Sequence, residues 1–170
     1  MKTLILMRHA KSDWAGPGMD DHDRALNKRG RSAAPVMAHW LAARGLRPGK
    51  MLCSPSRRTR ETAALMHDAM PWLPEPDLPA ALYHAGPGTI LEHLRRLAKG
   101  CDCALVIAHE PGLGALLRML GGRACNHFPT AAIAVLEADI GDWRDLGADR
   151  VAFVAFAVPR ELMEHPPPGA

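Results

Sequence analysis

The stretch LILMRHAKS, residues 4–12, decides the fold of this chain. Its first four residues are apolar, and the run ends abruptly at a cation and an imidazole, Arg8 and His9. A short apolar run bounded in this way predicts a buried strand. In an open parallel sheet, ligands bind beyond the carboxyl ends of the strands. The stretch therefore predicts that Arg8 and His9 lie at the ligand-binding edge of a sheet.

Apolar runs of the same kind recur along the chain, separated by segments of helical length. We expect further strands at Lys50–Cys53, Cys103–Ala108, Ala131–Glu137 and Val151–Val158. We expect helices from the cap Asn27 to about Ala43, from Ser54-Pro55 to about Met70, over about Gly88–Lys99, and from Pro111 to Leu120. This alternation predicts an α/β fold, a three-layer αβα sandwich with a mostly parallel sheet and an antiparallel edge from the last two strands.

The length and composition predict one globular domain. The chain has 170 residues, 48% apolar and 23% charged, which excludes a disordered or fibrous protein. We expect a single domain over residues 1–160 and a frayed, proline-rich tail over 161–170. Residues 11–26 are expected to form a long loop and residues 71–79 a connector. Pro35 is expected to kink the first helix or to mark its true start.

Several classes of protein are disfavoured. No apolar run approaches the roughly 18 residues of a membrane span, and the first apolar run is too short for a signal peptide. The four cysteines show no CxxC spacing, so we expect reduced thiols in a cytoplasmic protein. No HExxH signature is present, and we expect no metal and no cofactor. One Tyr and three Phe give few platforms for stacking nucleic-acid bases.

The net charge of +3 conceals an asymmetry along the chain. Residues 1–60 contain 13 Lys and Arg against 4 Asp and Glu, whereas residues 61–170 contain 8 against 14. A local basic excess indicates an anionic ligand, although a solvated helix face would produce the same count.

Polar groups follow three of the expected strands. Arg8-His9 follows the first, Ser54-Pro55-Ser56-Arg57-Arg58 the second and His109-Glu110-Pro111 the third. The last two groups also begin helices, whose N-termini add backbone N–H donors and a positive dipole end. Two imidazoles and several guanidiniums at one sheet edge predict a site for a phosphoryl group.

These residues resemble a known family. Leu6-Met7-Arg8-His9-Ala10-Lys11-Ser12, then Ser54-Pro55-Ser56-Arg57-Arg58, and the late Val106-Ile107-Ala108-His109 are similar to the motifs of the histidine phosphatase (phosphoglycerate mutase-like) superfamily, in its SixA branch. The resemblance covers nearly the whole chain. It implies a phosphoglycerate mutase-like fold, with His9 as a nucleophile that is transiently phosphorylated and His109 completing the pocket. It also implies that Arg8, Arg58 and Arg24 bind the phosphoryl oxygens, and we expect Arg57 to be solvated.

A phosphate ester needs a general acid to protonate its leaving group, whereas phosphohistidine leaves as an imidazole, so the presence of a proton donor helps to define the substrate. Larger family members carry their acid in an inserted cap, but residues 59–108 leave no room for a cap domain. Asp13 and Glu110 are the candidate donors, and most acids of the loop after His9 are expected to be solvated. Glu61 is expected to pair with Arg57 or Arg58. We expect ordinary packing of Tyr83-His84, with the pocket mouth as the alternative place.

The sequence therefore predicts a metal-independent phosphoric hydrolase that acts on phosphohistidine in a protein. The alternatives are a phosphomonoesterase for small metabolites and a non-catalytic phosphate-binding domain. The expected partner is a phosphorylated protein or a small phosphate ester, with no nucleic acid and no membrane. We expect a monomer.

Overall fold

The computed structural model describes residues 1–14, 16–121 and 127–166, and within them the chain forms one six-stranded sheet flanked by five α-helices. The strand order is β3-β2-β4-β1-β5-β6. The strands are β1 (Lys2–Arg8), β2 (Lys50–Cys53), β3 (Pro76–Asp77), β4 (Cys103–Ala108), β5 (Ile133–Ala138) and β6 (Val151–Ala157). The helices are α1 (Lys28–Ala43), α2 (Arg57–Ala69), α3 (Pro87–Arg95), α4 (Gly112–Met119) and α5 (Pro159–Glu164).

The sheet is mixed, as the sequence predicts. Strand β4 pairs in parallel with both β1 and β2, and β2 pairs in parallel with β3. Strand β5 runs antiparallel to both β1 and β6, so the last hairpin forms the antiparallel side. The predicted α/β class is confirmed. Between α2 and β4 the chain forms only β3, a 3-10 turn at Ala80–Leu82 and α3, so no cap domain is inserted there.

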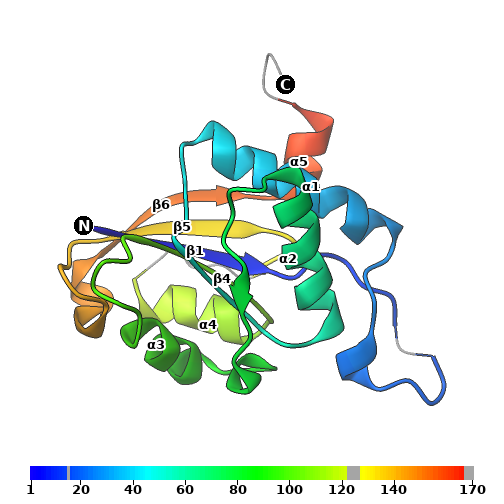
Figure 1. Ribbon diagram of the computed structural model, residues 1–170, viewed down its shortest axis with the longest axis horizontal. Coiled ribbons are helices and arrows are strands. Elements are labelled where there is room, and N and C mark those ends of the chain that lie inside the picture. The colour runs from blue at the N-terminus through cyan, green and yellow to red at the C-terminus, as the bar shows by residue number, and fades with distance from the viewer. Residues whose placement is uncertain (15, 122–126, 167–170) are drawn as a thin grey trace.

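Strand β1 separates two apolar cores. Its side chains alternate, so that Leu4 and Leu6 pack on the side of α3 and α4, while Ile5 and Met7 pack on the side of α1 and α2. All four of these side chains are fully buried, as is typical of a strand covered on both faces. Figure 1 shows the arrangement, with α3 and α4 together on one side of the sheet and α1 and α5 on the other.

Helix α1 begins at Lys28, and the prediction that Pro35 marks its true start is wrong. The Asn27 side chain accepts a hydrogen bond from the Gly30 N–H at 2.9 Å, and the Asn27 carbonyl accepts one from Arg31 at 3.0 Å. This capped first turn fixes the start. The helix then continues past Pro35 to Ala43, held to the core by buried residues such as Met37.

Two glycines bring loops close to the sheet edge. A Cβ at Gly30 would lie 2.1 Å from the Lys11 carbonyl oxygen, so glycine lets the loop after β1 run against α1. A Cβ at Gly112 would lie 1.9 Å from the Ala85 carbonyl oxygen, so glycine lets the loop before α3 run against α4. Both loops reach the site described below.

Other boundaries differ from the predictions for local reasons. Residues 161–164 belong to α5 and are not frayed, because Leu162 packs against the core on the α1 side. Ala131 has a φ of 60°, so β5 begins two residues later than predicted. The connector 71–79 contains β3, and the loop 11–26 contains a 3-10 turn at Asp21–Asp23. Cys53, Cys101 and Cys103 are free thiols, and Cys125 lies outside the described residues.

Candidate active site

Three side chains predicted from the strand ends meet at one edge of the sheet. His9 follows β1, Arg58 lies in the first turn of α2 after β2, and His109 follows β4. All three are buried, with 7%, 2% and 2% of their surface exposed. The rings of His9 and His109 lie 5.3 Å apart between centroids and are tilted by 56°. The structure therefore brings together the three side chains that the sequence predicts to meet at this edge.

The backbone of β4 fixes the two neighbouring strand ends. The His9 N–H donates to the Ala108 carbonyl at 3.1 Å, and the Ser54 N–H donates to the Ile107 carbonyl at 3.0 Å. The ends of β1 and β2 are thus tied to the last two residues of β4, immediately before His109. The distance between neighbouring strands therefore sets the spacing of the residues that follow them.

His9 is held with one ring nitrogen available for attack. Its Nδ1 lies 2.8 Å from the Ala10 carbonyl oxygen, which can only accept, so Nδ1 carries the proton and Nε2 the lone pair. Burial, helped by the charges of Arg58 and Arg8, lowers the pKa of His9 to about 3. The ring is therefore neutral at physiological pH, which is the state that a nucleophilic imidazole requires.

His109 is neutral for similar reasons. Burial and the neighbouring His9 and Arg58 lower its pKa to about 2. Its Nδ1 lies 3.4 Å from Arg58 Nη2, which can only donate, so Nε2 carries the proton and donates to Ser54 Oγ at 2.7 Å. Ser54 was not singled out from the sequence as a site residue, because a serine after a strand has many ordinary roles.

Arg58 is paired with an acid of the loop after β1. Its Nη1 donates to the Asp21 carbonyl oxygen at 2.7 Å and its Nη2 to Asp21 Oδ2 at 3.1 Å. The same carboxylate accepts hydrogen bonds from Tyr83 and His84, the latter at 2.9 Å, and from Arg24 at 2.9 Å. Asp21 is therefore an exception to the expectation that most acids of this loop are solvated.

The charge of Asp21 is strongly stabilised. Burial acts to raise its pKa, but the hydrogen bonds from Tyr83, His84 and Arg24 outweigh it and hold the pKa well below the usual range. Asp21 is thus a permanent anion and not a proton donor near neutral pH. His84 lines the cavity, contrary to the ordinary packing expected of it, and its φ of 49° places it in the left-handed region.

The other two predicted phosphate ligands differ in what they contact. Arg24 donates to Asp21, to Ser12 Oγ at 2.8 Å and to the Asp13 carbonyl at 2.7 Å, so it ties the loop together while it lines the cavity. Arg8 donates to the Phe128 carbonyl at 3.0 Å. Its Nε is buried and has no hydrogen-bond partner in the described part of the chain. Arg8 therefore retains capacity for an incoming acceptor.

The two candidate proton donors lie in different places. Glu110 lines the cavity, but its Oε1 accepts a hydrogen bond from the Gly114 N–H in the first turns of α4. Asp13 is exposed and is absent from the residues that line the cavity. The predicted pair of Glu61 with Arg57 is confirmed, with Oε1 and Nε 2.9 Å apart.

Together these residues enclose a polar cavity of about 220 Å³. Its lining comprises Arg8, His9, Lys11, Ser12, Trp14, Asp21, Arg24, Arg58, His84, His109, Glu110 and Thr130. The described residues contain no group of three His, Cys, Asp or Glu side chains arranged to hold a metal ion. Within the same residues, no helix is long and apolar enough to cross a membrane. Cations and neutral imidazoles around a small cavity suit a phosphoryl group.

Comparison with known proteins identifies the family. The family model of the histidine phosphatase superfamily (branch 1) matches residues 4–79. An uncharacterized protein of Mycobacterium tuberculosis is 37% identical over 168 residues, covering 91% of this chain and 100% of the relative. The chain belongs to the histidine phosphatase superfamily.

This histidine phosphatase is of the SixA type. Phosphohistidine phosphatase SixA of Escherichia coli is 29% identical over 139 residues, covering 80% of this chain and 85% of that protein. The structure of a putative phosphohistidine phosphatase SixA from Nakamurella multipartitia matches with a TM-score of 0.81 and 26% identity, covering 93% of this chain and 96% of that chain. Membership of this superfamily supports a phosphatase activity, which makes the protein a hydrolase.

Proposed function

We propose that this histidine phosphatase hydrolyses phosphohistidine on a protein through a phosphorylated His9. The observation that carries the proposal is the state of His9, a neutral ring with Nδ1–H bound to the Ala10 carbonyl and Nε2 left for attack. The guanidiniums of Arg8 and Arg58 and the ring of His109 line the same cavity. The absence of an inserted cap between α2 and β4 suits a substrate as large as a protein.

In the first step, the lone pair of His9 Nε2 attacks phosphorus. A new N–P bond forms while the N–P bond of the substrate breaks. The electron pair of the broken bond goes to the ring nitrogen of the substrate imidazole, whose other nitrogen already carries a proton from solvent, so a neutral imidazole leaves. Arg8 and Arg58 hold the phosphoryl oxygens as charge redistributes, in the two-pronged manner that guanidiniums allow. These fixed cations take the charge-stabilising role, so the proposal includes no metal ion.

In the second step, water attacks the phosphorylated His9. The bond between phosphorus and Nε2 breaks, the electron pair returns to Nε2, and inorganic phosphate leaves. The hydrogen bond from Nδ1 to the Ala10 carbonyl persists through both steps. Division of one difficult displacement into two easier ones is the general advantage of covalent catalysis.

The leaving group favours phosphohistidine over a phosphate ester. An imidazole, with an ordinary pKa of about 6.5, leaves without a dedicated acid, whereas an alkoxide needs one. Asp21 is held as an anion, Glu110 accepts a backbone N–H, and Asp13 is outside the cavity lining. One observation favours the alternative phosphomonoesterase: His84 lines the cavity with its Nε2 oriented by Asp21, as a proton-donating imidazole would be.

The experiment is a trapping and competition assay. Wild-type protein, His9→Ala and a matched exposed-histidine variant, His39→Ala, are incubated with a phosphohistidine peptide and quenched in alkali. We expect acid-labile phosphate on His9 in the wild type and in His39→Ala. We expect a loss of turnover of at least about 10³-fold in His9→Ala. Activity that survives His9→Ala would refute the mechanism, and preference for a sugar phosphate over the peptide would favour the alternative substrate class.

A further inference from the structure

A second, larger cavity lies beside the phosphoryl cavity. It has a volume of about 610 Å³ and lies between the first turn of α1, the segment before β5 and the start of α5. Lys11 and Thr130 line both cavities, so the two are adjacent. We call the larger one the α1–α5 groove. Its lining comprises Lys11, Lys28, Arg29, Ser32, Ala33, Pro129, Thr130, Val158, Pro159, Arg160, Met163 and Glu164.

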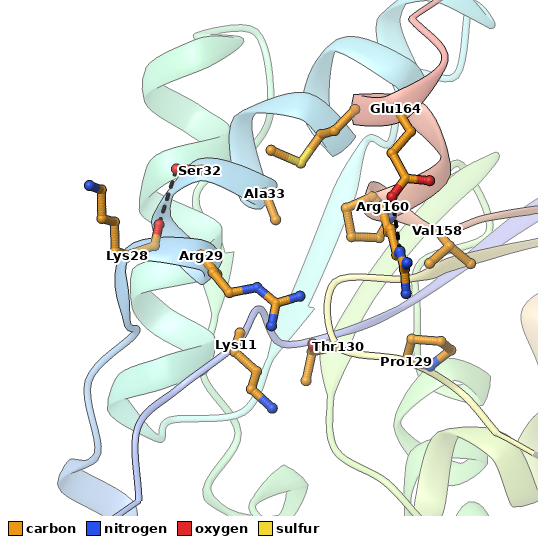
Figure 2. A pocket seen from close by; sticks show the side chains of 12 residues that line it. Lys11, Lys28, Arg29, Ser32, Ala33, Pro129, Thr130, Val158, Arg160 and Glu164 are labelled. Atoms are coloured by element: carbon orange, nitrogen blue, oxygen red, sulfur yellow. Dashed lines mark hydrogen bonds and ion pairs between the residues drawn. The ribbon is translucent and has the colours of Figure 1, made fainter.

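The groove has a positive charge that the fold does not neutralise. Figure 2 shows the Arg29 guanidinium pointing into it toward Lys11 and Thr130, whereas the Lys28 amine points away. Among the described residues, no hydrogen bond or ion pair is recorded for the guanidinium of Arg29 or the amine of Lys11. The carboxylate of the lining, Glu164, is bound by Arg160 Nε at 3.0 Å. A net excess of cations therefore faces the groove.

Arg29 also occupies an unfavourable position for a cation. It is the second residue of α1, and the first turn of this helix contains no acidic residue. The positive end of the helix dipole disfavours a cation there. Arg29 lies in this unfavourable position without a partner among the described residues. An anion from another molecule would stabilise its charge there.

The remaining lining indicates the kind of anion. Ala33, Val158, Pro159 and Met163 give the groove an apolar wall, and Met163 is 51% exposed. A free phosphate or a second phosphoryl group would not need an apolar wall of this extent. Of the residues that the structure describes, no aromatic one lines the groove, so this lining lacks the stacking platforms of a single-stranded nucleic-acid site. Cations beside an apolar wall match a polypeptide that carries carboxylates and aliphatic side chains.

We infer that the α1–α5 groove binds an acidic, partly apolar segment that flanks the phosphorylated residue of a protein substrate. This inference rests on the proposed function and names the feature that selects among phosphoproteins. The shared lining residues Lys11 and Thr130 connect the groove to the phosphoryl cavity, so one extended segment would lie across both. Its carboxylates would contact Arg29 and Lys11, and its aliphatic side chains would contact Val158 and Met163.

The test compares two short phosphohistidine peptides of equal length. One carries Asp, Glu and Leu beside the phosphohistidine, and the other carries Asn, Gln and Leu. Arg29→Glu reverses the groove charge and leaves the phosphoryl cavity lining intact. Arg150→Glu is the matched control, an exposed arginine just before β6 and away from both cavities.

We expect the wild type and Arg150→Glu to prefer the acidic peptide by about tenfold in kcat/KM, mainly through KM, as rim charges typically allow. Arg29→Glu would lose this preference and retain wild-type turnover of p-nitrophenyl phosphate. The preference would also fall with added salt. Equal turnover of the two peptides by the wild type, or an unchanged preference in Arg29→Glu, would overturn the inference.

A binding measurement separates this inference from the proposed function. If neither peptide is hydrolysed while p-nitrophenyl phosphate is, the phosphohistidine proposal fails. The unphosphorylated acidic peptide, labelled for fluorescence anisotropy, still reports on the groove. Weaker binding to Arg29→Glu than to Arg150→Glu would support the inference. Equal binding to both variants, or binding of a single-stranded oligonucleotide in place of the peptide, would overturn it.

Discussion

Helices α1 and α2 begin alike in sequence and differ in how the fold treats their charges. Each starts with two consecutive cations, Lys28-Arg29 in α1 and Arg57-Arg58 in α2, and neither has an acidic residue in its first turn. In α2 both cations have internal partners, Glu61 for Arg57 and Asp21 for Arg58.

In α1 the guanidinium of Arg29 is exposed and has no recorded partner in the described part of the chain. The same local pattern therefore lies at the candidate active site in α2 and at the proposed peptide groove in α1. The difference depends on the loop after β1, whose Asp21 reaches α2 and not α1.

The largest expected effect on activity comes from substituting one of the two arginines that begin α2, Arg58, and comparing it with the other, Arg57. We expect Arg58→Ala to lower kcat/KM by about 10³-fold, because a preorganised donor to the phosphoryl group is lost. Arg58→Lys should recover only part of this, since an ammonium cannot make a two-pronged contact. Arg57→Ala, which removes an exposed pair with Glu61, should stay within about twofold. Steady-state kinetics with p-nitrophenyl phosphate measure all three, and equal losses in Arg57→Ala and Arg58→Ala would contradict the assignment.

Burial, with a smaller contribution from Arg58 at the start of α2, keeps the imidazoles of His9 and His109 neutral, and pH tests this. The folded pKa values of His9 and His109 are lowered to about 3 and about 2, below the ordinary value of 6.5. The unfolded chain therefore binds more protons between about pH 3 and 6.5. We expect the free energy of unfolding to fall as the pH drops below 6.5, by up to about 1.4 kcal/mol per pH unit for each imidazole.

Denaturant titrations from pH 7 to pH 4 measure this loss of stability. His109→Gln carries one buried imidazole fewer and should show a shallower dependence, while His39→Ala serves as the exposed control. An identical pH dependence in wild type and His109→Gln would show that the buried ring does not contribute.

A moderate effect is expected when the internal partner of α2 is neutralised. Asp21→Asn leaves Arg58 buried beside an uncharged amide, and we expect the free energy of unfolding to fall by about 1–2 kcal/mol. Inorganic phosphate should then raise the Tm more than it does in the wild type, because it replaces the lost charge. Asp23→Asn, in the same turn, is the control. A Tm response to phosphate no larger than that of wild type would argue against Asp21 as the internal counter-charge.

The smallest expected effect concerns α1. Arg29→Glu replaces a cation by an anion in the first turn, and we expect the free energy of unfolding to rise by about 0.3–1 kcal/mol. The same change at Arg150 should have no such effect. A decrease in stability in Arg29→Glu would mean that Arg29 supports the fold, and its retention for a partner would lose its basis.

The sequence was sufficient for the parts of the site that depend on regular structure. Arg8, His9 and His109 follow apolar runs, and strand ends in a parallel sheet converge whatever the loops do. Asp21 and His84 could not be placed in this way. Their positions depend on a 3-10 turn in an irregular loop and on a left-handed backbone at His84.

The same distinction explains the errors in the fold. Composition predicts a frayed, proline-rich C-terminal segment, but Leu162 packs α5 against the core and Pro159 is buried. Proline is intrinsically disfavoured inside a helix, and this preference predicts a helix start at Pro35. The Asn27 cap and the buried residues of α1 override it. Cys125 lies outside the described residues, and the prediction of a reduced thiol there stays a prediction.

The backbone bonds from His9 and Ser54 to the last carbonyls of β4 have a consequence for how the protein can change. They make the spacing of the reactive groups a property of the interstrand repeat, about 4.8 Å, which side-chain substitution does not alter. The backbones of His9 and His109 can therefore keep one separation while loops at the mouth of the cavity change.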